Sequence, residues 1–127
     1  MIVFDSNYLI GAPKPNSPER DEIKRWHFAG EILATSSIAW TEFLSGPVTQ
    51  ENIADLRALL PGGILEFDEV CAATAARLFN ATGRKRSLRV DAMIAATAIE
   101  NGARLATRNT TDFQLFVPHG LKLAPRD

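Results

Sequence analysis

The sequence predicts an α/β fold, in which a mostly parallel sheet of four to five strands carries helices on both faces. Two observations support this prediction. Short apolar segments alternate along the chain with longer amphipathic segments, and strands that alternate with helices imply right-handed crossovers between parallel strands. The chain has 127 residues, of which 46% are hydrophobic, so it can bury one core, and we expect residues 1–127 to form a single domain.

Each strand is predicted from a short apolar run bounded by polar or turn-forming residues. The first run, Met1–Phe4, is continuously apolar, which is typical of a strand buried on both faces in a parallel sheet. The other expected strands are Ile32–Thr35, Ile64–Phe67, Arg104–Thr107 and a short fifth strand at Leu121–Leu123.

Helices are predicted where apolar residues recur at helical spacing between capping and terminating residues. Ser17, Ser36 or Ser37, and Asp68 are well placed as N-caps, because their side chains can accept hydrogen bonds from the first backbone N–H groups. The stretch Gly11–Pro18 holds three prolines and is expected to be a loop. The expected helices are Pro18–Phe28, a segment that carries Ile38–Leu44, Gln50–Leu60, Glu69–Thr82 and Ser87–Asn101.

The composition favours an intracellular protein. Cys71 is the only cysteine, which excludes an internal disulfide and a cysteine-based zinc site and suits a reducing compartment. The mostly apolar stretch Val90–Ile99 is too short to cross a bilayer, and no basic region precedes the first strand. We therefore expect a soluble, uncleaved, cytoplasmic protein.

The formal net charge of −1 gives the chain no overall attraction to nucleic acid. A polyanion would have to be held by a local patch, and the segment GRKRSLR, just ahead of Asp91, is a candidate. Such a segment can equally be a solvated loop. This basic cluster consists of Arg84, Lys85, Arg86 and Arg89.

Four acidic residues stand where folding alone does not require an acid. Asp5 follows the first strand, Asp112 lies just past the fourth, and Asp91 opens the helix that leads into the fourth. Because open α/β sheets bind ligands at the carboxyl ends of their strands, these three acids can face one edge of the sheet. Glu42 has no lysine or arginine at helical spacing, and its helix follows the second strand, so Glu42 can reach the same edge.

Each acid could also have a purely structural role. Asp5 could form an Asx turn, and Glu42 could be exposed to solvent. Asp91 could cap its helix, or it could lie in the first turn behind a cap at Ser87. Asp112 could lie in the first turn of a short helix that Thr110 or Thr111 caps.

Other catalytic signatures are missing from the sequence. There is no Gly-rich phosphate loop, no Gly-x-Ser-x-Gly elbow and no His-Glu-x-x-His motif. His27 and His119 have no nearby partner at ligand spacing. Nucleotide-dependent and serine-hydrolase chemistry are therefore disfavoured.

Four segments, in this order, resemble the motifs of the PIN-domain ribonucleases, and in particular the VapC-type toxins of prokaryotic toxin–antitoxin pairs. FDSNYLI resembles the opening strand and Asp-Thr/Ser-Asn motif, TEFLSG the Thr-Glu segment, VDAMIAATA the third motif, and ATRNTTDF the closing Thr-Arg-Asn-x-x-Asp-Phe. The resemblance spans almost the whole chain. It departs from the family at Ser6, where threonine is commoner, and in the proline-containing loop before Ser17.

The resemblance implies a PIN-like three-layer α/β/α sandwich with one acidic active site. The metal-binding and catalytic residues that it implies are Asp5, Glu42, Asp91 and Asp112. Supporting polar residues would be Ser6 or Asn7, and Thr107 or Asn109. It also implies Mg²⁺ or Mn²⁺ as the cofactor, RNA as the substrate, a homodimer, and a cognate antitoxin that blocks the site. The basic cluster would then contact RNA phosphates.

The chemistry of carboxylates agrees with this implication. Carboxylate oxygens suit hard cations, and one ion, or two roughly 3.5 to 4 Å apart, would activate water for in-line attack on a phosphodiester. The leading hypothesis is a metal-dependent endoribonuclease that acts as the toxin of a type II toxin–antitoxin system. The alternatives are a catalytically silent PIN-fold binding or regulatory module, a PIN-type nuclease without a toxin role, and a DNA-directed nuclease.

Overall fold

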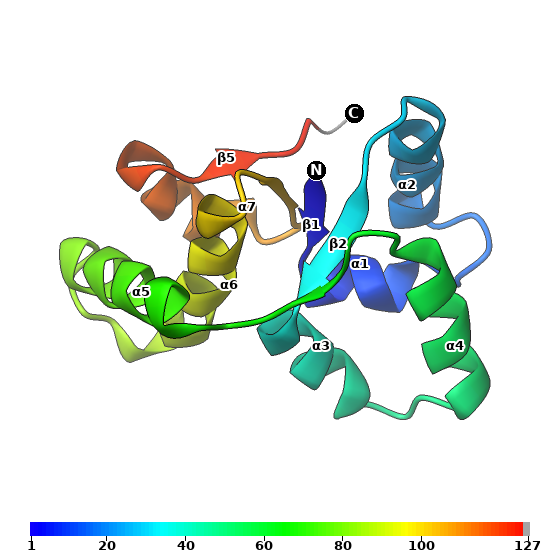
Figure 1. Cartoon of the computed structure of the whole chain (residues 1–127), viewed down its shortest axis with the longest axis horizontal. Coiled ribbons are helices and arrows are strands. Elements are labelled where there is room, and N and C mark those ends of the chain that lie inside the picture. The colour runs from blue at the N-terminus through cyan, green and yellow to red at the C-terminus, as the bar shows by residue number, and fades with distance from the viewer. Residues whose placement is uncertain (126–127) are drawn as a thin grey trace.

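The computed structural model describes residues 1–125 and contains a five-stranded sheet between layers of helices (Figure 1). The strand order is β3-β2-β1-β4-β5, and every pair of neighbouring strands is parallel. The predicted α/β class and the parallel five-stranded sheet are therefore confirmed. The strands are β1 (Ile2–Phe4), β2 (Leu33–Ser36), β3 (Gly63–Leu65), β4 (Arg104–Ala106) and β5 (Lys122–Leu123).

Most helices begin and end within one or two residues of their predicted bounds. The predicted caps are confirmed, because the side chains of Ser17, Ser36 and Asp68 each accept a hydrogen bond from a backbone N–H of the first turn. The helices are α1 (Ser6–Gly11), α2 (Pro18–Phe28), α3 (Ser37–Leu44), α4 (Gln50–Leu59), α5 (Glu69–Ala81), α6 (Arg89–Glu100) and α7 (Thr110–Phe113), with 3-10 turns at Arg86–Leu88 (η1) and Gln114–His119 (η2).

The helix α1 was not predicted, and the start of α6 differs from the prediction. The Asp5 side chain caps α1, and Tyr8 and Leu9 are buried on the inner face of this helix. Six residues are too few to show a helical period in the sequence. Ser87 lies inside η1 and does not cap α6, which begins at Arg89. Asp91 lies in the first turn of α6, as one of the two alternatives predicted, but the residue at the N-cap is Leu88 and not Ser87.

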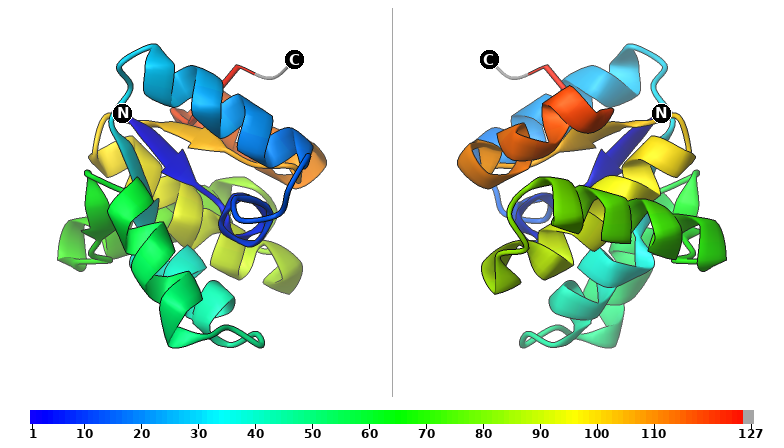
Figure 2. Two further views of the ribbon diagram at one scale, coloured as in Figure 1. Left: turned by 90° about the vertical axis from the view of Figure 1, so that its right-hand side faces the viewer. Right: turned by 90° about the vertical axis from the view of Figure 1, so that its left-hand side faces the viewer.

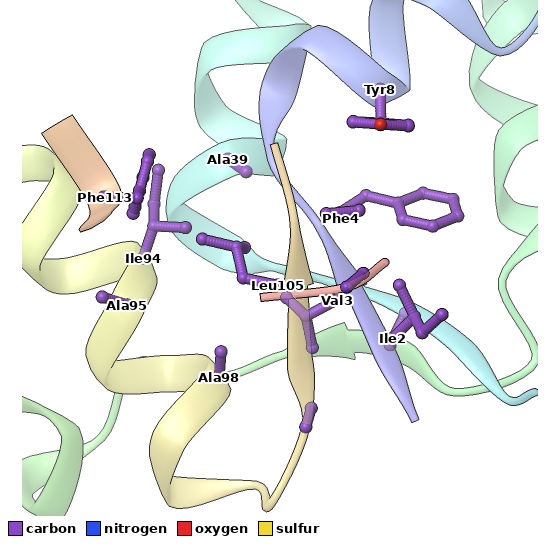
Figure 3. Close-up of a cluster of buried hydrophobic side chains, with 14 of the residues drawn as sticks. Ile2, Val3, Phe4, Tyr8, Ala39, Ile94, Ala95, Ala98, Leu105 and Phe113 are labelled. Atoms are coloured by element: carbon purple, nitrogen blue, oxygen red, sulfur yellow. The ribbon is translucent and has the colours of Figure 1, made fainter. Parts of the chain in front are cut away.

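Helices α2 and α6 lie on opposite sides of the sheet (Figures 1 and 2). Trp26 of α2 packs against Phe4 of β1, and α6 contacts β2 and β4 on the other side. Figure 3 shows Ile94 and Ala98 of α6 on one side of β1 and β4, with Phe4 on the other side. The core therefore has two parts, one on each face of the sheet, and α5 packs outside α6.

One edge of the sheet is where the chain leaves its strands. Figure 1 shows β1 and β2 running into α1 and α3 at the same edge. In a parallel sheet, the segments that follow the strands gather at this carboxyl edge, and ligands of open α/β sheets bind there. Within residues 1–125, no helix combines the length and the apolar character that a membrane span requires.

Candidate active site

The predicted acids come from four segments that begin near the carboxyl edge of the sheet. Asp5 directly follows β1 and forms the N-cap of α1. The α3 helix, which carries Glu42, begins directly after β2. Asp91 lies in the first turn of α6 and Asp112 in the first turn of α7.

The Asp5 carboxylate is buried, with 6% of the residue exposed, and both of its oxygens accept hydrogen bonds. The Ser6 backbone N–H donates to Oδ1 at 2.8 Å, and the Thr107 hydroxyl donates to Oδ2 at 2.7 Å. Burial raises the pKa of Asp5, whereas the bonds from Thr107 and Ser6 act to lower it. The two bonds hold the carboxylate in one orientation at the end of β1.

The pKa of Asp91 shows that the four acids form one electrostatic cluster. Burial, followed by the negative charges of Asp5, Asp112 and Glu42 in that order of size, raises this pKa from 3.8 to about 6. Asp91 is therefore close enough to each of the other three carboxylates to be repelled by them. We call these residues the acidic cluster: Asp5, Glu42, Asp91 and Asp112.

Glu42 and Asp112 complete the cluster. Partial desolvation raises the pKa of Glu42, the charge of Asp5 adds to the rise, and the Ser6 side chain opposes it. The Asp112 carboxylate accepts a hydrogen bond of 3.1 Å from the side-chain amide of Asn109. The pKa of Glu42 therefore responds to the same neighbour, Asp5, that affects Asp91.

Of the predicted supporting residues Asn7, Thr107 and Asn109, the last two bond to acids of the cluster and Asn7 bonds to the backbone next to it. The Thr107 hydroxyl bonds to Asp5 and also accepts a 3.0 Å hydrogen bond from the Asn109 backbone N–H. The side-chain oxygen of Asn7 accepts a 3.3 Å hydrogen bond from the Arg108 backbone N–H. Asn7 thus ties the start of α1 to the segment after β4, whereas Thr107 and Asn109 contact the acids themselves.

Sequence reasoning missed a second charged network behind this segment. The Arg108 guanidinium bonds to Glu22 of α2 and, at 3.3 Å, to Glu19, and it lies 5.0 Å from the ring centroid of Tyr8. The Tyr8 hydroxyl donates to Glu22 at 3.2 Å, and only 4% of Glu22 is exposed. Glu19 and Glu22 lie one turn apart on α2, but nothing in the sequence indicates that this face of α2 meets Arg108.

The basic cluster lies at the junction between α5 and α6. Arg84 and Arg89 place their guanidinium carbons 5.6 Å and 5.1 Å from the ring centroid of Phe79. Lys85 and Arg86 are exposed in the same segment. Because Arg89 is the first residue of α6, the basic cluster ends on the helical turn that carries Asp91.

The acidic cluster supplies carboxylate oxygens, which are the donors that hard divalent cations prefer. Across residues 1–125, no group of three or more histidine, cysteine, aspartate or glutamate side chains is placed so that it could hold a metal ion. Mg²⁺, however, is usually held by one or two carboxylates while it keeps several waters. The pKa of Asp91 is raised by burial and by the repulsion of three neighbouring carboxylates, and a cation would relieve that repulsion.

Comparison with known protein families identifies the fold. The model of the PIN domain family matches residues 2–115, which is most of the chain. The chain belongs to the PIN domain family. This is a family of nucleases, so membership supports nuclease activity for the protein. A comparison with curated proteins found no match.

Solved structures agree with this assignment. A chain of FitAcB from Neisseria gonorrhoeae is 24% identical with a TM-score of 0.73, and the match covers 98% of this chain and 97% of that one. A chain in a toxin–antitoxin complex from Klebsiella pneumoniae is 27% identical, with a TM-score of 0.70 and coverage of 89% and 90%. VapBC2 from Rickettsia felis, bound to a promoter DNA fragment, gives 21% identity, a TM-score of 0.74 and full coverage of both chains. The predicted PIN-like fold is confirmed.

Proposed function

We propose that this PIN domain is a Mg²⁺- or Mn²⁺-dependent endoribonuclease. The observation that carries the proposal is the acidic cluster, in which burial and then the charges of three other carboxylates raise the pKa of Asp91. Such repulsion destabilises a fold, so the presence of the four acids together favours a functional role for them. Hydrolysis of a phosphodiester, assisted by a divalent cation, is the chemistry that this donor set suits.

We further propose that the protein is the toxin of a toxin–antitoxin pair, works in the cytoplasm, forms a homodimer and binds a cognate antitoxin. The support is the similarity, at 27% identity, to a chain in a toxin–antitoxin complex from Klebsiella pneumoniae. The match to a chain of FitAB bound to DNA, at 25% identity and a TM-score of 0.74, adds to this support. The antitoxin would cover the carboxyl edge of the sheet and so exclude RNA.

The residues of the chain would divide the work between orientation and proton transfer. A bound cation would lower the pKa of a water molecule and neutralise charge that develops on the phosphate. Asp5, fixed by Thr107 and the Ser6 N–H, provides a carboxylate that does not need to reorient on binding. A carboxylate oxygen of Asp91, which accepts no hydrogen bond within residues 1–125, takes a proton from the attacking water. The leaving oxygen takes a proton from solvent.

Purified protein tests the nuclease proposal directly. With Mg²⁺ or Mn²⁺ it should cleave single-stranded RNA and leave DNA of the same sequence intact, and a chelator should stop the reaction. Asp5→Asn should abolish cleavage, while Asp55→Asn, at an exposed acid on α4, should not. Cleavage that persists in Asp5→Asn would place the chemistry elsewhere, and equal cleavage of DNA would remove the RNA preference.

Induced expression tests the toxin proposal. The unmodified chain should arrest growth of the host, and the Asp91→Asn variant should not. Coexpression with the product of a neighbouring antitoxin gene should restore growth. Equal growth of cells that express either protein would remove the toxin role and leave the nuclease role in place.

A further inference from the structure

A groove of about 430 Å³ lies between α5 and α6, apart from the acidic cluster. Phe67, Phe79 and Met93 give it an apolar lining, together with alanines of α5. Arg84 and Arg89 supply its charged groups. Among the described residues no acid lines this α5–α6 groove, so it combines aromatic surface with unopposed positive charge.

The backbone of the α5–α6 junction directs one of these arginines back over the groove. Gly83 and Arg84 both have left-handed backbone angles, with φ of 88° and 57°. Such angles are uncommon for a residue other than glycine. The Arg84 backbone N–H donates to the Phe79 carbonyl at 3.0 Å, which closes the turn. The Arg84 side chain is exposed, and its guanidinium lies over the Phe79 ring and donates a hydrogen bond to the side-chain oxygen of Asn80, which also lines the groove.

A nucleotide has the complementary chemistry. Its base is flat and can stack on aromatic side chains without regard to sequence, which is how single-stranded nucleic acids are commonly held. Its phosphate suits guanidinium groups, which donate two parallel hydrogen bonds to an anion. An acidic or purely apolar peptide would use only one of the two features of the groove.

The position of the groove relative to the acids supports the same ligand. Arg89 and Asp91 lie on one turn of α6. Because they are two residues apart in a helix, their side chains point in directions about 200° apart around the helix axis. A strand that crosses the N-terminal end of α6 would therefore pass from the groove to the acidic cluster. That end of a helix also favours negative charge, as carried by the phosphates of the strand.

We propose that the α5–α6 groove binds a nucleotide of single-stranded RNA close to the one that is cut, with the base against Phe79 and Met93 and the phosphate against Arg84 and Arg89. The inference rests on the proposed ribonuclease function and adds a base-binding subsite to it. It gives the basic cluster two kinds of residue. All four residues are exposed, but Arg84 and Arg89 line the subsite, whereas Lys85 and Arg86 lie outside it.

Two alanines of α5 allow a matched test. Both Ala76 and Ala73 are exposed, but Ala76 lines the groove and Ala73 does not. Ala76→Glu puts a carboxylate into the groove, and Ala73→Glu puts the same charge on the same helix outside it. Each is combined with Asp91→Asn, and fluorescence anisotropy measures binding of a short unstructured RNA. Ala76→Glu should weaken binding roughly ten-fold relative to Ala73→Glu.

An abasic site moved along the RNA identifies the base contact. In otherwise unmodified protein, cleavage should slow when the abasic position lies next to the cut, and Ala76→Glu should show no such position dependence. Arg84→Ala and Arg86→Ala remove equal charge from one loop, and Arg84→Ala should reduce the dependence more. If the cleavage rates of Ala76→Glu and Ala73→Glu depend equally on the position of the abasic site, the subsite is wrong but the proposed nuclease function stands.

Two more outcomes would also overturn the subsite. If the unmodified protein neither binds nor cleaves RNA with metal present, both the subsite and the proposed function are wrong. Light scattering after size exclusion reports the oligomeric state of both glutamate variants. If Ala76→Glu alone dissociates an oligomer while cleavage of RNA keeps its dependence on the abasic position, the groove joins two copies of the chain, and the subsite is wrong.

Discussion

Asp91→Asn should stabilise the fold at neutral pH although it removes a proposed catalytic group. The pKa of Asp91 is about 6 in the folded protein and has an ordinary value of 3.8. Between these two values the folded state binds a proton that the unfolded state has released. Stability therefore falls as the pH rises through this window, and above pH 6 the ionised carboxylate imposes its full cost. Asparagine carries no charge and removes that cost.

The size of the effect follows from the pKa. A rise from 3.8 to about 6 corresponds to about 3 kcal/mol at 1.36 kcal/mol for each pKa unit. Asp91 is only partly buried, and solvent screening reduces the expected gain to about 1–2 kcal/mol. For a domain of this length the gain corresponds to a melting temperature roughly 3–10 °C higher.

Thermal melting with a chelator measures the gain. Asp91→Asn should melt above the unmodified protein at neutral pH, and the difference should fade as the pH approaches about 4. Asp55→Asn controls for the loss of one exposed negative charge. Added Mn²⁺ should raise the melting temperature of the unmodified protein more than that of Asp91→Asn, because binding to the native state stabilises it. A lower melting temperature for Asp91→Asn, or a gain that persists at pH 4, would show that repulsion at Asp91 does not destabilise the fold.

Three further predictions concern the groups around the acids. Thr107→Val leaves Asp5 without a hydroxyl donor and should cost about 1–3 kcal/mol in urea unfolding and lower kcat, with Thr107→Ser as the control. Glu22→Gln should lower the free energy of unfolding by a similar amount, and by more than Glu19→Gln does, because Glu22 is the more buried partner of Arg108. At fixed low Mg²⁺, kcat/KM should fall as the pH drops through about 6 because Asp91 protonates; a flat profile would exclude Asp91 as the base.

The position of the acids in the fold can be predicted from the sequence, whereas the contacts that surround them cannot. Strand ends are local features, so the positions of Asp5 and Asp112 after β1 and β4 follow from apolar runs of three or four residues. Contacts between distant segments have no such local signal. The bond from Thr107 to Asp5 spans 102 residues, and the ion pair of Arg108 with Glu22 spans 86. The pattern of each segment shows that it is polar, but only the packed sheet brings the partners together.

Asp5 and Asp91 show how the fold distributes the cost of the cluster. Asp5 is the more buried, and two hydrogen bonds offset part of its desolvation. No hydrogen bond within residues 1–125 offsets the desolvation of the Asp91 carboxylate, and the repulsion of three neighbouring charges adds to its cost. Asp91 is therefore the acid whose charge a cation would stabilise most. Cation binding and the pKa of Asp91 must then be linked, so rising Mg²⁺ should shift the pH dependence of activity to lower pH.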